Sequence, residues 1–143
     1  MSVRELTIEA KKENLDKVMA FLESRLEELN CTPKAQIQIS VAMEEIFVNV
    51  ASYAYQHLKN IKEGPGMVSI RVEDTEDPRS VAVTFEDSGI PFDPLSRQDP
   101  DVSLPAEERG IGGLGIYMVK KSMDHVHYEY KDGKNIMTFR KDL

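Results

Sequence analysis

The sequence predicts a two-layer α+β sandwich, in which three helices cover one face of a mostly antiparallel, mixed sheet. Segments with alternating apolar and polar residues predict five strands, and segments with apolar residues at helical spacing predict three helices. Along the chain they follow the order strand, helix, helix, strand, strand, loop, helix, strand, strand. This order is typical of helices packed on one face of an antiparallel sheet.

The first half of the chain holds one strand and two helices. Residues 3–9 alternate well enough to predict the opening strand, and residues 13–29 form an amphipathic helical pattern. Thr32-Pro33 supplies a helix cap followed by proline at the first helical position, so a second helix is predicted over about 33–57. Its centre, residues 37–54, is apolar on most of its circumference. We therefore expect this helix to be deeply buried.

Strand patterns in the second half fall at residues 67–73, 80–86, 125–131 and 135–140. Asp132-Gly133, between the last two, is typical of a two-residue hairpin turn. Residues 88–112 lose all periodicity and are rich in proline and glycine, and a loop this long is usually functional or disordered. Residues 114–123 return to helical spacing.

The composition narrows the class of protein. A length of 143 residues fits one domain, and the net charge of −7 favours protein or nucleotide partners over nucleic acid. Cys31 is the single cysteine, so no internal disulfide can form. No apolar run reaches the roughly 20 residues of a membrane span, and the start of the chain lacks the apolar core of a signal peptide. We expect a cytoplasmic protein. A homodimer is compatible with these observations.

Two acids in the second helix break its apolar pattern. Between Lys34 and Lys59 the only charged residues are Glu44 and Glu45, and burying a carboxylate is unfavourable unless it is compensated. Glu45 and Asn49 are four positions apart and share one face of the helix. A carboxylate beside an amide oxygen suits Mg²⁺, which prefers oxygen ligands. The plainer interpretation is that both glutamates lie on a solvent-facing edge.

A second break follows the strand at 80–86, where Asp87 is followed two positions later by Gly89. An aspartate at a strand end can accept a hydrogen bond from an exocyclic amine such as that of adenine. A glycine there lets the backbone approach a flat ring closely. The alternative is a common turn in which the aspartate bonds its own backbone.

A third break is the glycine-rich run at 109–115, RGIGGLG, directly before a helix. Uncovered backbone N–H groups and a helix N-terminus together make a cradle for anions. The run lacks the Gly-Lys-Ser/Thr of a P-loop and does not follow a strand, so neither a P-loop nor a dinucleotide fold is indicated. The alternative is a flexible hinge.

Taken in this order, the three breaks resemble the motifs of the histidine-kinase-like ATPase superfamily, whose members include gyrase, the histidine kinases, a mismatch-repair protein and a heat-shock chaperone. Glu45-x-x-x-Asn49 looks like the N box, Asp87-x-Gly89 the first glycine box and residues 110–115 the second. The likeness is nearest to the bacterial anti-sigma-factor serine/threonine kinases, which carry a Pro-Phe-Asp-Pro run such as 91–94. It covers nearly the whole chain, as one Bergerat-type domain over residues 1–143.

The resemblance implies a role for each side chain of the first two motifs. Glu45 would be the general base that accepts a proton from the attacking hydroxyl, and Asn49 would ligate Mg²⁺. Asp87 would read the adenine amino group, with Gly89 beneath the ring. Thr138, on the last strand, would line the adenine pocket.

The resemblance also implies how the ATP phosphates are held. The backbone around them would come from Gly110, Gly112, Gly113 and Gly115. Arg109 would touch the phosphates or a partner, and residues from about 95–112 would form a mobile lid.

The implied function is that of an ATP-dependent protein serine/threonine kinase, an anti-sigma regulatory factor whose partners are a sigma factor and an antagonist protein. One alternative is an ATP-binding interaction module with little kinase activity. Another is an ATPase fragment that drives a conformational cycle, which is less favoured because no transducer domain follows residue 143. Glu45 favours the kinase, because nucleotide binding needs Asn49 and Asp87 but no base.

Overall fold

The computed structural model describes residues 2–55, 66–76, 79–96 and 114–143. Its strands are β1 (Val3–Glu9), β2 (Met67–Thr75), β3 (Ser80–Asp87), β4 (His125–Lys131) and β5 (Lys134–Asp142). Its α-helices are α1 (Leu15–Glu28), α2 (Pro33–Asn49) and α3 (Leu114–Ser122). Shorter helical turns are Lys12–Asn14, Val50–Ala54 and Pro94–Ser96, of which Val50–Ala54 is π-helical and continues α2.

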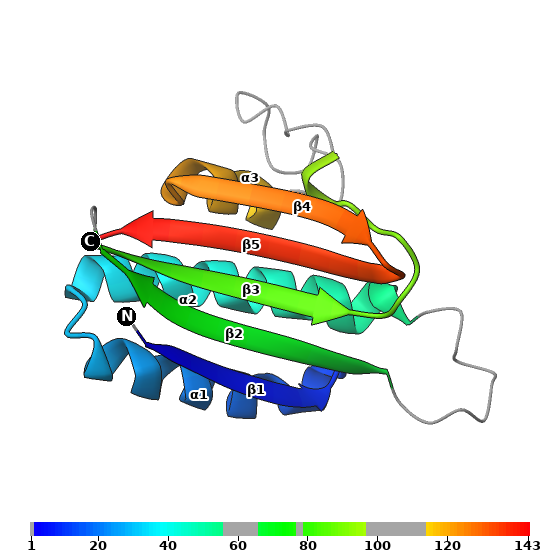
Figure 1. The fold of residues 1–143 in the computed structure, drawn as a ribbon, viewed down its shortest axis with the longest axis horizontal. Coiled ribbons are helices and arrows are strands. Elements are labelled where there is room, and N and C mark those ends of the chain that lie inside the picture. The colour runs from blue at the N-terminus through cyan, green and yellow to red at the C-terminus, as the bar shows by residue number, and fades with distance from the viewer. Residues whose placement is uncertain (1, 56–65, 77–78, 97–113) are drawn as a thin grey trace.

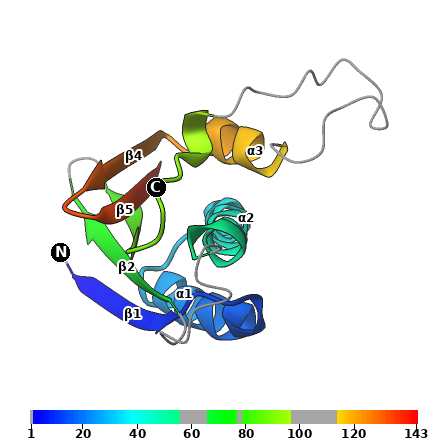
Figure 2. The ribbon, with the colours of Figure 1, turned by 90° about the vertical axis from the view of Figure 1, so that its right-hand side faces the viewer.

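The predicted α+β class is confirmed. The five described strands form one sheet in the order β1-β2-β3-β5-β4, and the three α-helices lie on one of its faces, with α2 between α1 and α3 (Figures 1 and 2). Every pairing between these strands is antiparallel, so the sheet in this part of the chain is antiparallel throughout and not mixed.

Two local signals in the sequence form the structures they predict. The Thr32 hydroxyl accepts a hydrogen bond from the backbone N–H of Ala35 at 3.2 Å, and Pro33 opens α2. Asp132 and Gly133 have φ of 54° and 77°, the backbone of a two-residue turn that matches the twist of a hairpin. This turn joins β4 to β5.

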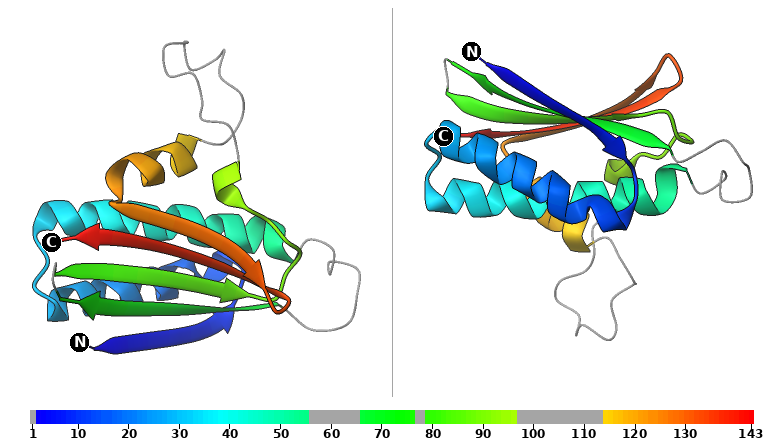
Figure 3. Two further views of the ribbon diagram at one scale, coloured as in Figure 1. Left: turned by 45° about the horizontal axis from the view of Figure 1, so that its top comes forward. Right: turned by 90° about the horizontal axis from the view of Figure 1, so that it is seen from below.

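The core lies between the sheet and the helices (Figure 3). Alternate residues of the inner strands point into it, because side chains along a strand alternate between faces. They pack against the inner sides of α1 and α2, and the largest fully buried side chains include Phe47, Phe85, Phe139, Leu22, Leu26 and Ile39. No helix in the described part of the chain is long and apolar enough to cross a membrane.

The expectation that α2 is deeply buried is wrong on one side of the helix. Ile37 is 65% exposed and Val41 is 50% exposed. The sheet covers one side of α2, while α1 and α3 flank it (Figure 2). The fold has two layers, so no described element covers the fourth side. His57, the predicted end of this helix, lies outside the described residues.

Candidate nucleotide-binding site

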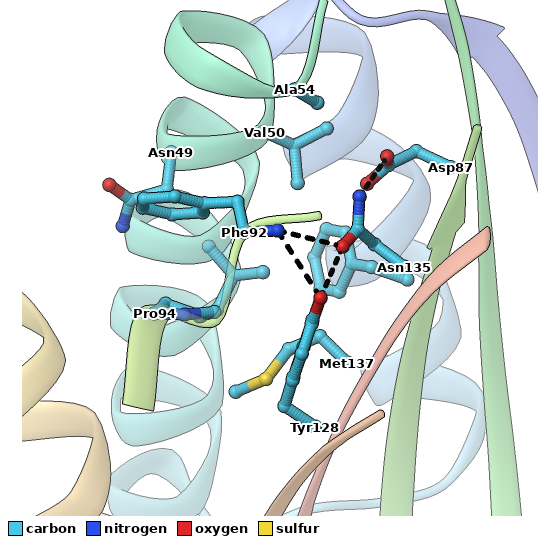
Figure 4. Close-up of a pocket in the computed structure, with 11 residues that line it drawn as sticks. Asn49, Val50, Ala54, Asp87, Phe92, Pro94, Tyr128, Asn135 and Met137 are labelled. Carbon is cyan, nitrogen blue, oxygen red and sulfur yellow. Dashed lines mark hydrogen bonds between the residues drawn. The ribbon is translucent and has the colours of Figure 1, made fainter. Parts of the chain in front are cut away.

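A small cavity lies where the end of α2 meets the end of β3, the segment after β3, and strands β4 and β5 (Figure 4). Its volume of about 20 Å³ has room for about one water molecule. The lining residues are Ile46, Asn49, Val50, Ala54, Phe85, Asp87, Phe92, Pro94, Tyr128, Asn135 and Met137. Asn49 and Asp87, predicted from separate motifs, thus line one cavity.

Asp87 ends β3 and is only 5% exposed. Its Oδ1 accepts hydrogen bonds from the Gly89 N–H at 2.8 Å and from Asn135 Nδ2 at 3.0 Å. Burial raises the pKa of the Asp87 carboxyl, and these two hydrogen bonds act in the opposite direction. The turn proposed as an alternative is therefore present, and Asp87 lines the cavity as well. Since both bonds go to Oδ1, Oδ2 is the oxygen left to meet a ligand.

Gly89 is required by close packing against the end of the π-helical turn. A Cβ at this position would overlap the backbone carbonyl of Ala54. The same carbonyl accepts a hydrogen bond from the Ile90 N–H at 2.8 Å, and the Tyr55 hydroxyl accepts one from the Ser88 N–H at 2.8 Å. These contacts fasten the segment after β3 to the end of α2. They hold the two predicted motifs at a fixed separation.

Glu45 and Asn49 occupy one face of α2, as their spacing predicts. Asn49 Nδ2 donates to the Glu45 backbone oxygen at 2.9 Å and lies 3.4 Å from Glu45 Oε1. Because the nitrogen is used in this way, the amide oxygen is the atom turned outward. Glu45 is half-buried, whereas Glu44 is exposed, so the solvent-edge interpretation holds for Glu44 alone.

The carboxylate of Glu45 reaches the start of α3. A Cβ at Gly115, the second residue of α3, would overlap this carboxylate. A helix N-terminus attracts negative charge, since its first N–H groups carry partial positive charge. The structure therefore brings the end of the glycine-rich run to the acid of the first motif.

Among the residues of the cavity that were not predicted as site residues, Asn135, Tyr128 and Phe92 are joined by hydrogen bonds. Asn135 lies directly opposite Asp87 in the pairing of β3 with β5. Its Oδ1 accepts hydrogen bonds from the Phe92 N–H at 3.0 Å and from the Tyr128 hydroxyl (Figure 4). Burial raises the pKa of Tyr128, and its hydroxyl is the donor in the bond to Asn135. Asn135 thus links Asp87 to the segment that follows β3.

The prediction that Thr138 lines the adenine pocket is wrong. Thr138 is paired with Thr84, and their hydroxyl oxygens are 3.2 Å apart. Because side chains alternate along β5, Thr138 points to the sheet face away from the helices, while its neighbour Met137 lines the cavity.

The aromatic ring of Phe92 covers part of the site. In Figure 4 it extends from the segment after β3 toward Asn49 on α2. It packs against Tyr53, with ring centroids 5.2 Å apart and planes at 31°. Phe92 and Pro94, from the same segment, form part of the cavity wall.

Four predicted phosphate-binding residues lie outside the described part of the chain: Arg109, Gly110, Gly112 and Gly113. The same holds for residues 97–112 of the predicted lid.

The structure thus brings together the Asn49 amide on α2, the buried Asp87 at the end of β3 and the N-terminus of α3 beside Glu45. The chain belongs to the family of the histidine kinase-like ATPase domain, whose sequence model matches residues 8–141. The predicted resemblance is thereby confirmed.

The chain is also similar in sequence to individual proteins with names. The chain is 31% identical over 101 residues to serine-protein kinase RsbW of Bacillus subtilis (strain 168), which covers 68% of this chain and 59% of that protein. It is 28% identical over 103 residues to serine-protein kinase RsbW of Listeria monocytogenes, covering 69% and 61%. The aligned part is thus about three-fifths of the length of these relatives.

A solved structure shares the fold. The crystal structure of the RsbU and RsbW domains of Rv1364c from Mycobacterium tuberculosis superposes with a TM-score of 0.67 at 15% identity. The match covers 100% of this chain and 33% of that one. At this identity the likeness concerns the fold alone.

Proposed function

We propose that this chain binds Mg-ATP and transfers its terminal phosphoryl group to a serine or threonine of an antagonist protein, and that it holds a sigma factor in a partner switch. The observation that carries the proposal is the position of Glu45, whose carboxylate lies against Gly115 and one helical turn from Asn49. A pocket that only binds nucleotide has no need of this carboxylate. The relatives named serine-protein kinase support the same activity.

Asp87 would select the base. Its Oδ2 can accept a hydrogen bond from the exocyclic amine of adenine, whereas guanine presents a carbonyl there, which would repel the carboxylate. The apolar walls of the cavity, from Ile46, Val50 and Met137, suit a flat ring. Since the cavity has room for about one water, adenine would enter only when Phe92 and its segment move outward.

Asn49 would hold the metal through its amide oxygen. Among the described residues, no three His, Cys, Asp or Glu side chains gather into a metal site. A bound Mg²⁺ would therefore be coordinated by Asn49, phosphate oxygens and water, the ligands that this ion commonly takes. It would neutralise charge that develops on the phosphates during transfer.

Glu45 would accept the proton of the attacking hydroxyl. In the transfer, a bond forms between this hydroxyl oxygen and the γ-phosphorus, the bond to the bridging oxygen of ADP breaks, and the proton moves to Glu45. The N-terminus of α3, beside Glu45, would face the transferred charge with its partial positive end.

Glu45→Gln tests this role, with Glu44→Gln as a matched control. The two acids are neighbours on α2, but Glu44 is exposed, and the three atoms nearest to a Cβ at Gly115 all belong to Glu45. Glu45→Gln should reduce transfer from labelled ATP by about 10²–10⁴-fold, the usual contribution of a general base. ATP affinity, measured by calorimetry, should change little in either variant, and Glu44→Gln should keep full transfer.

The substrate for this assay is the antagonist, recovered by its association with the chain in the presence and absence of ATP and identified by mapping its phosphorylated residue. If wild-type protein binds that partner tightly but transfers no phosphate at any Mg²⁺ concentration, the kinase proposal fails and the interaction module stands. If Glu45→Gln lowers the melting temperature and ATP affinity together, Glu45 supports the fold and is not the base.

A further inference from the structure

A groove runs between α1 and α2 on the side of the helices that faces away from the sheet. Its volume is about 400 Å³, and it shares no lining residue with the nucleotide cavity. It is lined by Met19, Glu23 and Glu27 of α1 and by Gln36, Ile37, Ser40, Val41 and Glu44 of α2. Figure 3 shows α1 and α2 side by side, with their outer surfaces open.

Two large apolar side chains of α2 lie exposed along the groove. Ile37 and Val41, one helical turn apart, are 65% and 50% exposed, and Met19 lines the groove from α1. A helix face with large apolar side chains at this spacing matches the anchors of an amphipathic helix laid into a groove. Scattered apolar residues need no explanation, but here they gather in one concave surface.

The rim of the groove is acidic and lacks counter-ions. It carries Glu23, Glu27 and Glu44, and no lysine or arginine is among its lining residues. In the described part of the chain none of these three carboxylates forms an ion pair. On another face of α1, by contrast, Glu28 pairs with Arg25 at 3.0 Å.

We propose that this groove docks an amphipathic helix of a partner protein, with apolar side chains against Ile37 and Val41 and lysine or arginine side chains against the three glutamates. The negative charge of the rim predicts a positively charged partner surface, because like charges across an interface are strongly unfavourable. An anionic membrane surface or a nucleic acid would be repelled. The proposal goes beyond the proposed function, since it assigns partner binding to a surface that the proposed function leaves unassigned, and docking there requires neither nucleotide nor phosphoryl transfer.

The first test uses two synthetic helical peptides with the same apolar face, one with lysine on its flanks and the other with glutamate. Fluorescence anisotropy with the full chain should show binding of the lysine peptide only. Ile37→Asp combined with Val41→Asp should weaken it at least about tenfold, because it removes the apolar contact. Met118→Asp, at a 49% exposed position on α3, is the matched control and should have no effect.

Charge reversal tests the rim. Glu23→Lys with Glu27→Lys should weaken the lysine peptide about tenfold and permit binding of the glutamate peptide. Glu5→Lys with Glu129→Lys changes the net charge equally at exposed strand positions and should leave the lysine peptide bound. Equal loss in both double variants would mean that net charge alone attracts the peptide, and the docking site would be wrong. Unchanged melting curves and ATP affinity ensure that each variant is folded.

A second test identifies the natural occupant. A photoreactive residue at Val41, and another at Met118 as control, would be cross-linked in living cells and the attached segment identified by mass spectrometry. A segment specific to Val41 with a basic, amphipathic helical sequence supports the proposal. An acidic segment, or no product specific to Val41, overturns it.

Discussion

Two aspartates at opposite ends of the sheet show how the same side chain serves two purposes. Asp74 lies near the end of β2, and Asp87 ends the antiparallel neighbour β3. Asp74 Oδ1 accepts hydrogen bonds from the Ser2 N–H and hydroxyl and lies 3.5 Å from Arg25 Nη2. The hydrogen bonds from Ser2 lower the pKa of Asp74, whereas burial raises the pKa of Asp87.

The difference lies in what completes each cluster. Arg25 has a side chain only 4% exposed, and it meets Asp74, Glu28 and the backbone oxygen of Ser2. This cluster is closed by opposite charges and ties the N-terminal segment to α1 and β2. Among the described residues, Asp87 accepts hydrogen bonds from neutral groups, and both go to Oδ1. The charge of Asp74, which supports the fold, is compensated by Arg25 and Ser2. Asp87, which lines the cavity, keeps Oδ2 available to a ligand.

Asp87→Asn should give the largest change in ATP affinity. It is also the most direct test of the difference between Asp87 and Asp74. It replaces the acceptor proposed for the adenine amine with an amide, and we expect ATP affinity to fall at least about 100-fold. The free energy of unfolding should stay unchanged or rise, because the charged carboxyl is disfavoured by burial. Calorimetry and denaturant unfolding at neutral pH measure both. ATP affinity retained within a few-fold would remove Asp87 from the adenine site.

Asp74→Asn should give the reverse result. It weakens the hydrogen bonds from Ser2 and removes a negative charge beside the buried Arg25, so the free energy of unfolding should fall by about 1–2 kcal/mol. ATP affinity should stay within twofold, because this cluster lies at the other end of the sheet. Calorimetry and denaturant unfolding at neutral pH measure these two quantities as well. A loss of ATP affinity without a loss of stability would contradict the division between the two acids.

The pH dependence of unfolding should show smaller effects with opposite signs. The folded pKa of Asp87 is raised, so wild-type protein should gain stability relative to Asp87→Asn as pH falls through that pKa, until the ordinary value of about 3.9 is passed. The folded pKa of Asp74 is lowered. Wild-type protein should therefore lose its advantage over Asp74→Asn as pH falls below about 3.9 toward that pKa. Parallel curves for the two pairs would contradict the assigned shifts.

Local patterns in the sequence were enough to predict each strand, the helix cap at Thr32-Pro33 and the turn at Asp132-Gly133. The resemblance to the ATPase superfamily, and not a local pattern, assigned Asn49 and Asp87 to one site, and both residues line one cavity. These features depend on neighbours along the chain, or on motifs whose order the family shares.

Asn135 was missed because its role depends on strand pairing. The register of β3 with β5 places Asp87 opposite Asn135. No local pattern in the sequence predicts which residue of another strand lies opposite Asp87. A signal was nevertheless present: Asn135 shares a face of β5 with buried Met137 and Phe139, and Thr138 does not. The role that the resemblance implied for Thr138 did not take this alternation into account.

The exposed side of α2 could not be predicted from its composition. Ile37 and Val41 are apolar like the buried Ile39 and Met43, and only the number of layers in the fold decides which of them meet solvent. The π-helical turn at Val50–Ala54 likewise has no signal among the patterns used. It matters to the site, since it delivers the Ala54 carbonyl to Ile90.

The position of β5 inside the sheet, between β3 and β4, has a consequence for protein synthesis. While the chain emerges from the ribosome, β4 appears before the strand on which it must pair. Asp87 has no Asn135 beside it, and the Phe92 N–H lacks its bond to Asn135 Oδ1, until the segment from Lys134 to Asp142 has been made. A nascent chain that lacks this segment would keep β3 with an unpaired edge, a feature that promotes wrong association. Folding and the ability to bind nucleotide should therefore appear together, only after this segment has been made.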